Sequence, residues 1–238
     1  PLLNMVEREK LPLINHFYLG QYGSIHCFGA ELNPKTSIPT GYQTWGLRQL
    51  FGLIHDDLFA LAGRANHLLY WDSTTQFCGR CGHSTQLKKD ERAKECPKCG
   101  LIIYPQLSPA VIILIEKDHE ILLARSPRFK PGMYSVVAGF VEPGETLEQA
   151  VMREIQEEVG IHVHHIHYFG SQHWPFPQSL MIAFTAEYLN GQITIDHREI
   201  EDADWFTIDN LPPIPSKMSI SRRLIDWFIE KQTNKLKK

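Results

Sequence analysis

The clearest periodic pattern of apolar positions lies in the stretch 146–160. Apolar side chains recur there every four residues, at Leu147, Val151, Ile155 and Val159. This spacing places them on one face of an amphipathic helix. Thr146 and Gln149 have the form of a capping box, and Gly160 is a typical helix terminator. The pattern therefore predicts a helix that begins at Thr146 and ends before Gly160.

Shorter apolar segments alternate with turn signals and predict strands. The predicted strands are Ala110–Glu116, Ile121–Ala124, Ser135–Phe140, Val163–Phe169 and Leu180–Tyr188. Two further helices are predicted at Asp57–Tyr70 and Ser221–Lys231. The basic run 231–238 is predicted to be a frayed tail.

Composition limits the class of protein. The chain has 238 residues, of which 43% are hydrophobic and 21% charged, enough for one sizeable core and a smaller unit. The longest apolar run, Pro109–Ile115, is far shorter than the roughly 20 residues of a membrane span. A net charge of −3 argues against a generally basic nucleic-acid surface. We expect a globular cytoplasmic protein that does not enter a membrane.

Four cysteines form two closely spaced pairs. Cys78 and Cys81, and Cys96 and Cys99, are each separated by two residues, with a fourteen-residue spacer between the pairs. This pattern is typical of a zinc ribbon with one structural Zn²⁺ per chain, because four thiolates leave no open coordination position. Two disulfides are the alternative, but they would leave Cys27 unpaired, and paired cysteines of this spacing inside cells favour metal.

Acidic residues crowd the predicted helix 146–160. Glu154, Glu157 and Glu158 share a surface at i, i+3 and i+4, so they repel one another and raise their own pKa values unless a cation lies among them. Hard oxygen ligands of this kind suit Mg²⁺ or Mn²⁺. Arg153 can partly neutralise the set, and Glu145 lies close enough for an ion pair with this arginine. The alternative is a solvated acidic face.

The spacing around these acids favours the metal site. From Gly139 to Ile161 the order Gly-x5-Glu-x7-Arg-Glu-Ile-x-Glu-Glu-x-Gly-Ile resembles the signature of the Nudix hydrolases at every defined position. The resemblance implies hydrolysis of a nucleoside diphosphate linked to another moiety. It also implies two or three divalent cations bound in an α/β/α sandwich.

A second motif lies ten residues beyond this signature. The segment Ser171–Ser179 reads SQHWPFPQS, in which two prolines stiffen the chain and Trp174 and Phe176 offer flat surfaces for a base or nicotinamide ring. A rigid connector whose aromatics fill the core is the alternative. The segment resembles the SQPWPFPxS array of the NADH pyrophosphatases, also described as NAD-capped RNA decapping enzymes, which carry a Cys₄ ribbon before the Nudix domain. His173 stands where the family has proline.

The resemblance also implies roles for individual residues. As metal ligands it implies Glu154, Glu158, Glu199 and the backbone carbonyl of Ala138, with Glu157 in the same cluster and Arg153 and Glu145 in support. The implied substrate contacts are Gln172, His173, Trp174, Pro175, Phe176, Pro177, Gln178, Ser179, Glu91, Tyr104 and Ser221, with Arg48 as a weaker candidate and Phe140 as a stacking partner. Ser221 departs from the family, which usually has alanine there. A homodimer is implied as well.

The expected fold is a Nudix α/β/α sandwich, residues 105–238, preceded by a Cys₄ zinc ribbon, 77–104, and a small N-terminal α+β domain, 1–76. The expected activity is hydrolysis of NADH or NAD⁺ to NMNH or NMN and AMP, with removal of the NAD cap from RNA 5′ ends. A pyrophosphatase for ADP-ribose or another dinucleotide is the alternative among hydrolases. A zinc-ribbon nucleic-acid-binding protein is the alternative outside enzymes, although such a protein has no need of mutually repelling carboxylates.

Overall fold

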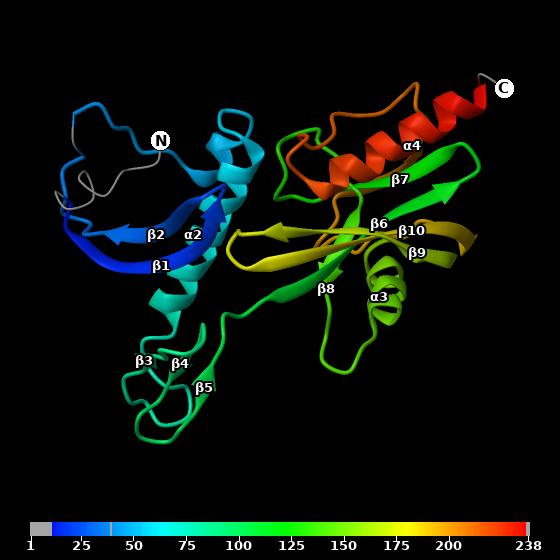
Figure 1. Ribbon diagram of the computed structural model, residues 1–238. Coiled ribbons are helices and arrows are strands. Elements are labelled where there is room, and N and C mark those ends of the chain that lie inside the picture. Colours follow the sequence, from blue (N-terminus) through cyan, green and yellow to red (C-terminus); the bar gives the residue numbers. More distant parts are fainter. Residues whose placement is uncertain (1–10, 39, 237–238) are drawn as a thin grey trace. The chain divides into compact units, whose positions relative to one another are not determined.

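The computed structural model describes residues 11–38 and 40–236, which form two compact units (Figure 1). The N-terminal unit extends to Gln106 and also includes Pro175–Gln178. The C-terminal unit comprises Leu107–Trp174 and the chain from Ser179 onward. Within the described residues, no helix is long and apolar enough to cross a membrane.

The N-terminal unit packs a β-hairpin on a long helix. Strands β1 (Leu13–Tyr22) and β2 (Ile25–Leu32) are antiparallel, and the 3₁₀ helix η1 (Leu47–Leu50) precedes α2 (Asp56–Thr74). The helix predicted at 57–70 is confirmed and is longer at its C-terminal end. The small core of this unit consists of Phe17, Leu19, Cys27, Leu68 and Trp71. A Cβ on Gly29 would lie 2.6 Å from the Cβ of Ala65, so glycine lets β2 approach α2 closely.

A buried ion pair connects this helix to the ribbon. Lys94 Nζ lies 2.6 Å from Asp72 Oδ1, and both side chains are buried. Asn15 and Gln76 donate hydrogen bonds to the other carboxylate oxygen of Asp72, at 2.8 and 3.2 Å. Because buried charges are tolerated only when they are paired and hydrogen-bonded, these contacts fix the end of α2 against the ribbon.

The ribbon itself contains little regular structure. Its three strands, β3 (Gln86–Leu87), β4 (Lys94–Glu95) and β5 (Ile102–Ile103), have two residues each and form one antiparallel sheet. So small a sheet buries too little apolar surface to be stable alone, and other bonds must hold it.

A mixed six-stranded sheet forms the centre of the C-terminal unit. Its strands are β6 (Ser108–Lys117), β7 (Glu120–Arg125), β8 (Val137–Phe140), β9 (Ile161–Trp174), β10 (Ser179–Gly191) and β11 (Asp202–Phe206). Their order is β11-β7-β6-β10-β9, with β8 paired to the first half of β6. The β6–β10 pair is parallel and the other pairs are antiparallel.

Helices α3 (Leu147–Val159) and α4 (Ile220–Leu236) cover opposite faces of this sheet (Figure 1). Along β6, Val111, Ile113 and Ile115 join the core under α3. The alternate residues Ile112 and Leu114 join the core under α4. Burial on both faces explains why the sequence of β6 is almost continuously apolar. The predicted α/β/α sandwich is confirmed.

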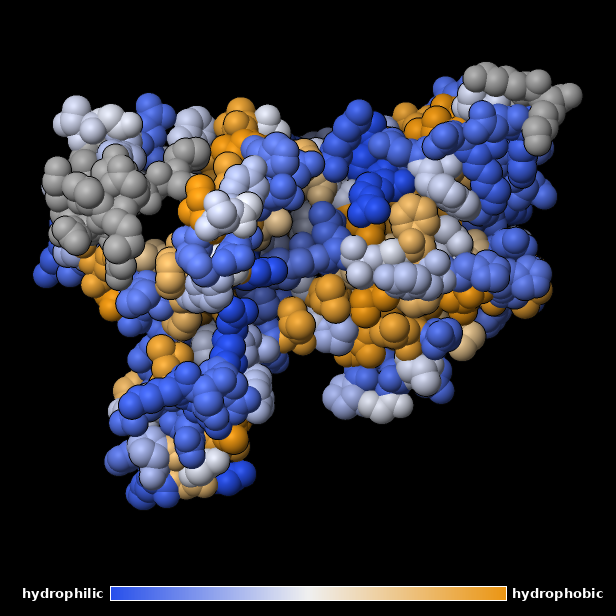
Figure 2. Space-filling model, in the orientation of Figure 1, coloured by the Kyte–Doolittle hydropathy of each residue, from blue (hydrophilic) through white to orange (hydrophobic). Residues whose placement is uncertain are grey.

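Two expectations for this unit need correction. Strands β9 and β10 extend well into the segment 171–179, where Trp174 pairs with Ser179, so only Pro175–Gln178 form a turn. The predicted frayed tail 231–238 is wrong for residues 231–236, because α4 continues to Leu236. Lys231 Nζ also lies 2.7 Å from a carboxylate oxygen of Glu116. Lys237 and Lys238 lie outside the described residues. Figure 2 shows mainly hydrophilic side chains on the visible side of α4.

Candidate active site

Local sequence fixes where α3 begins and ends. Gln149 N–H donates to Thr146 Oγ1 at 3.3 Å, and Thr146 N–H donates to Gln149 Oε1 at 2.8 Å, which completes the predicted capping box. Gly160 ends the helix with φ of 71°, a left-handed conformation that glycine adopts without strain. These two ends set the rotation of the helix and therefore the direction of its acidic side chains.

The acids of α3 divide between the interior and the solvent. Glu154 and Glu158 are each only 7% exposed, whereas the Glu157 side chain is 61% exposed. The three carboxylates therefore do not share one surface as expected, and a solvated acidic face is wrong for the two buried ones. Burial raises the pKa of Glu154. Burial, followed by the negative charges of Glu154 and Glu199, raises the pKa of Glu158 to about 8.

Arg153 connects the acidic helix to the loop that precedes it. Its guanidinium lies 2.5 Å from Glu145 Oε1, so the predicted ion pair is present. It also donates to Glu154 at 2.8 Å, to Glu157 at 2.9 Å and to the carbonyl oxygen of Phe140 at 2.9 Å. One positive charge thus faces three carboxylates and holds the end of β8 near the start of α3.

Gly139 provides the space that Glu154 occupies. A Cβ at this position would lie 1.9 to 2.1 Å from the carboxylate atoms of Glu154, an impossible separation. The neighbouring residue Ala138 pairs with Ile112 in the sheet, and its side chain packs on the α4 side. Strand β8 therefore directs Gly139 toward the acidic residues of α3.

A loop after β10 adds negative charge from a separate part of the chain. Glu199 contributes to the raised pKa values of both buried glutamates, which places it near them as expected. Asp196 also raises the pKa of Glu158, and its N–H donates to the carbonyl oxygen of Glu158 at 3.2 Å. Sequence reasoning missed Asp196, since no periodic pattern connects this loop to α3.

The donor set fits the divalent cations implied by the sequence. Glu154, Glu158, Glu199 and the Ala138 carbonyl would supply hard oxygen ligands, and burial together with neighbouring negative charges raises the pKa values of Glu154 and Glu158. Among the described residues, the sets whose ligand atoms all lie within 4.8 Å of one another are the four cysteines and a group of two histidines and Glu187. The carboxylate oxygens of the signature glutamates therefore lie farther apart than the ligand atoms of a closed metal shell.

The four cysteines form a compact thiol cluster. Cys78 Sγ lies 3.5 Å from Cys99 Sγ, and Cys81 Sγ lies 3.5 Å from Cys96 Sγ. Sulfurs bound to one tetrahedral Zn²⁺ at about 2.3 Å would be roughly 3.8 Å apart, so the cluster fits zinc. Each pair lies on a tight turn that ends at a glycine of positive φ, Gly82 or Gly100.

Several predicted substrate residues meet within the N-terminal unit. The Arg48 guanidinium stacks over the Phe176 ring, 4.2 Å from its centroid, and Asn66 donates to the Pro175 carbonyl at 3.0 Å. In the ribbon, Tyr104 Oη donates to Glu91 Oε2 at 3.0 Å. Arg48, the weaker of the sequence candidates, thus contacts the aromatic turn, and its role toward substrate stays a prediction.

Other predicted substrate residues lie in the C-terminal unit. The Gln172 amide donates to the Met218 carbonyl at 2.8 Å and accepts from Ile220 N–H at 2.7 Å, so it holds the start of α4. Ser221 is buried and lies 2.8 Å from the Ser219 hydroxyl. His173 pairs with Leu180 at the end of the β9–β10 hairpin, and Phe140 is 59% exposed.

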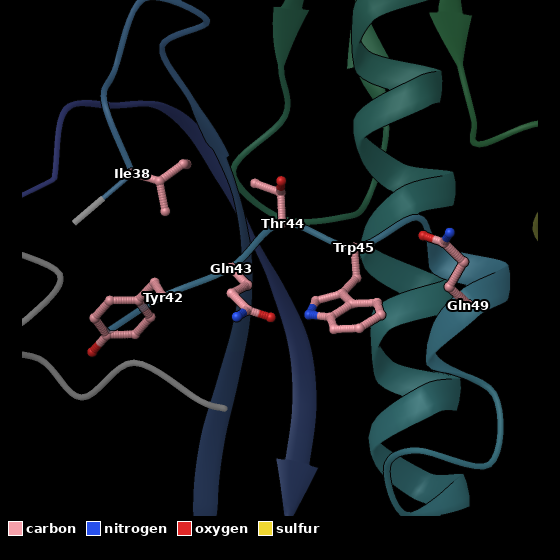
Figure 3. A pocket seen from close by; sticks show the side chains of 6 residues that line it. All are labelled: Ile38, Tyr42, Gln43, Thr44, Trp45 and Gln49. Atoms are coloured by element: carbon pink, nitrogen blue, oxygen red, sulfur yellow. The ribbon is translucent and has the colours of Figure 1, made fainter. Parts of the chain in front are cut away.

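A shallow hollow of about 510 Å³ lies in the N-terminal unit (Figure 3). Its lining residues are Ile38, Tyr42, Gln43, Thr44, Trp45 and Gln49. None of the predicted site residues lines it.

Fold and site together define a class of protein: an α/β/α sandwich with buried carboxylates suited to divalent cations. A family model described as "NUDIX domain" matches residues 106–228. Models described as "NADH pyrophosphatase zinc ribbon domain" and "NADH pyrophosphatase-like rudimentary NUDIX domain" match residues 73–104 and 4–71. The last match lies within the predicted N-terminal domain of residues 1–76.

Curated relatives agree with these models. The chain is 47% identical over 227 residues to the NAD-capped RNA hydrolase NudC of Stutzerimonas stutzeri, covering 95% of this chain and 82% of that protein. It is 48% identical over 212 residues to the protein of the same name from Deinococcus radiodurans, covering 87% and 75%. The chain belongs to the Nudix hydrolase family, in the branch that includes these NudC proteins.

A solved structure supports the fold independently. A Nudix hydrolase from Nitrosomonas europaea superposes with a TM-score of 0.57 at 23% identity, covering 67% of this chain and 93% of that one. At this identity the likeness concerns the fold alone.

Proposed function

We propose that this enzyme hydrolyses the pyrophosphate bond of NADH or NAD⁺ to NMNH or NMN and AMP, and that it removes the NAD cap from RNA 5′ ends. The names of the NudC relatives, which match nearly the whole chain, support this substrate class. The observation that carries the proposal is the burial of Glu154, against Gly139, and of Glu158. Arg153 pairs with Glu154, whereas Glu158 depends on bound cations or protons for compensation.

The carboxylates have the central role in the proposed mechanism. Glu154, Glu158, Glu199 and the Ala138 carbonyl would hold two or three Mg²⁺ or Mn²⁺ ions. Bound there, divalent cations neutralise pyrophosphate oxygens and lower the pKa of a water molecule. One glutamate of the cluster accepts the proton of the water that attacks phosphorus. Arg153 and Glu145 position this cluster, and the exposed Glu157 adds a further negative charge beside it.

Substrate recognition is assigned to the aromatic segment and the ribbon. Trp174 and Phe176 offer rings for stacking, and the guanidinium of Arg48 on Phe176 adds a positive charge beside one ring. The remaining contacts are proposed at His173, Pro175, Pro177, Gln178, Ser179, Phe140, Glu91, Tyr104 and Ser221. Gln172 acts through its hydrogen bonds to the start of α4.

Three regions organise this activity in our proposal: an N-terminal domain of residues 1–76, a zinc ribbon of 77–104 and a Nudix domain of 105–238. The ribbon zinc is structural, one per chain. A thiolate zinc site is typical of a reducing compartment, so we place the enzyme in the cytoplasm.

We further propose that the enzyme is a homodimer, because a ribbon that carries substrate contacts and no open metal position suits a subunit boundary. Sedimentation equilibrium, run alongside activity at the same protein concentration, tests this. A strictly monomeric mass with full activity would refute the dimer.

Product analysis tests the activity. The protein is incubated with Mn²⁺ and, separately, NADH, NAD⁺, ADP-ribose and a 5′-NAD-capped RNA. AMP with NMNH from NADH, and NMN with 5′-monophosphate RNA from the cap, are the expected products. Cleavage of ADP-ribose alone would leave Nudix chemistry standing and refute the assigned role of the aromatic segment. RNA retention without cleavage would favour the nucleic-acid-binding alternative.

Glu158→Gln is the control variant for that experiment. We expect it to lower kcat by on the order of 10² or more with little change in KM, because it removes a charge at the reacting centre and leaves the aromatic segment intact. An equal loss in kcat and in substrate affinity would assign Glu158 to positioning.

A further inference from the structure

Two consecutive histidines of β9 lie on the same face of the sheet, which a regular strand would not allow. Val163 and Ile166 are three residues apart, yet both pack against the core under α3. In a regular strand such residues face opposite sides. The strand pairing explains this, because His164 pairs with Glu187 whereas His167 pairs with Thr185. Three steps along β9 oppose two along β10, so β9 contains one extra residue, a β-bulge.

His165 adopts the unusual conformation of this bulge. Its φ is +50°, a left-handed value that few residues other than glycine, asparagine, aspartate and histidine adopt. The turn of the backbone brings the ring of His165 beside that of His164, with centroids 4.2 Å apart. Both rings therefore lie on the side of the sheet opposite Val163, which is the α4 side.

The two rings meet the Glu187 carboxylate across the strand pair. His165 Nδ1 lies 3.0 Å from Glu187 Oε2, and His164 is the direct cross-strand neighbour of Glu187. One ligand atom from each of the three side chains lies within 4.8 Å of the other two. All three are at least partly exposed, so an ion can reach them from solvent. The nearby Lys231 is paired with Glu116 through contacts of 2.7 and 2.9 Å.

We propose that His164, His165 and Glu187 form a surface site for a late first-row divalent cation such as Ni²⁺, Cu²⁺ or Zn²⁺. Two imidazoles and one carboxylate suit these metals and are poor ligands for Mg²⁺, which prefers oxygen alone. Three protein ligands leave further coordination positions for water or for a ligand from another molecule. The site is on the sheet face opposite α3, so it is distinct from the signature glutamates.

The same geometry without metal would be a simple histidine–glutamate ion pair, and a titration distinguishes the two. Untagged protein with one Zn²⁺ per chain in its ribbon, verified by elemental analysis, is held in excess Mg²⁺ so that the glutamates are occupied. Ni²⁺ is then titrated by calorimetry. We expect one additional equivalent of Ni²⁺ per chain, and with Cu²⁺ an electron paramagnetic resonance spectrum with nitrogen hyperfine coupling.

Variants assign the binding to these residues. His164→Gln and His165→Asn should each weaken Ni²⁺ binding at least tenfold, and asparagine tolerates the left-handed backbone of residue 165. His167→Gln, an exposed histidine on the same strand, is the matched control and should bind as the parent does. Circular dichroism checks that each variant folds. Absence of an additional Ni²⁺ equivalent, or equal binding in all three variants, would overturn the proposal.

Discussion

Gly139 leaves no room for a side chain, because the carboxylate of Glu154 lies against its Cα. We expect Gly139→Ala to displace Glu154 and to lower kcat for NADH by at least about tenfold, since displacing a catalytic group by 1 Å costs on the order of 10² in rate. Steady-state kinetics with Mn²⁺ measure this. Gly170→Ala is the control, because a Cβ there meets nothing within 4 Å. Activity retained in Gly139→Ala would contradict the proposed position of Glu154.

The buried carboxylate of Glu158 should make the metal-free protein less stable as pH rises. The unfolded chain ionises this group near its ordinary pKa of 4.5, whereas the folded protein holds the proton until about pH 8. The unfolded state therefore binds fewer protons between these values, and the free energy of unfolding falls from pH 5 to pH 8. The fall should exceed about 1 kcal/mol, because a tenfold change in a protonation equilibrium corresponds to about 1.4 kcal/mol.

Thermal unfolding in metal-depleted buffer, with the ribbon zinc retained, measures this slope. Glu158→Gln should flatten it, and added Mg²⁺ should raise the Tm of the parent more at pH 8 than at pH 5. Glu157→Gln changes an exposed acid on the same helix, whose charge is the smallest contribution to the raised pKa of Glu158, and should change the slope far less. Identical slopes in the two variants would be inconsistent with a buried Glu158.

At the residue scale, the sequence predicts what is encoded locally. The capping box, the terminating glycine and the Arg153–Glu145 pair all lie within one short segment, and each is present. Asp196 could not be found this way, because its proximity to Glu158 depends on a loop folding back from beyond β10. The pairing of His164 and His165 depends on a register shift between strands, which no local pattern indicates.

At the scale of the elements, the buried ion pair of Asp72 and Lys94 should be the ribbon contact whose loss most lowers the free energy of unfolding. Lys94→Met leaves the Asp72 carboxylate buried without its partner, which typically costs about 3–5 kcal/mol. Replacing both, in Asp72→Asn with Lys94→Met, should restore much of this loss. Lys88→Met removes a more exposed pair with Glu91 and should cost far less than Lys94→Met.

Urea unfolding followed by circular dichroism and fluorescence compares these three variants. The buried pair of Asp72 and Lys94 would not have the proposed role if the double variant were as unstable as Lys94→Met. The same would follow if Lys88→Met were as unstable as Lys94→Met.

Helices were predicted better than strand ends. Helix α3 and the apolar face of α4 follow from the helical spacing of apolar residues in the sequence. In the structure Leu224, Ile225 and Phe228 of α4 are buried. The strands predicted at 163–169 and 180–188 leave the segment 171–179, with its two prolines, outside the sheet. In the structure, pairing with β10 extends β9 to Trp174. The hairpin β1–β2 escaped notice because Ile14 and Tyr18, apolar in sequence, are exposed in the structure.

For the molecule as a whole, the stability of the ribbon should depend on its bound zinc. Cys96→Ser removes one of four thiolates, and we expect zinc content well below one per chain together with a lower Tm, because so small a sheet cannot hold its own core. Elemental analysis and thermal unfolding measure both. Cys27→Ser changes a cysteine of the hairpin core and should keep one zinc per chain. Full zinc content in Cys96→Ser would contradict the four-thiolate site.

The parallel pairing of β6 with β10 has a consequence for synthesis of the chain. Ser108 pairs with Ser179, so the partners are 71 positions apart in the sequence (179 − 108). While the ribosome is still producing this interval, the most apolar strand of the protein has one edge unpaired and one face without its helix α4. Nascent chains stalled within this interval should therefore bind chaperones that recognise extended apolar segments, and release should follow once β10 and α4 have left the exit tunnel.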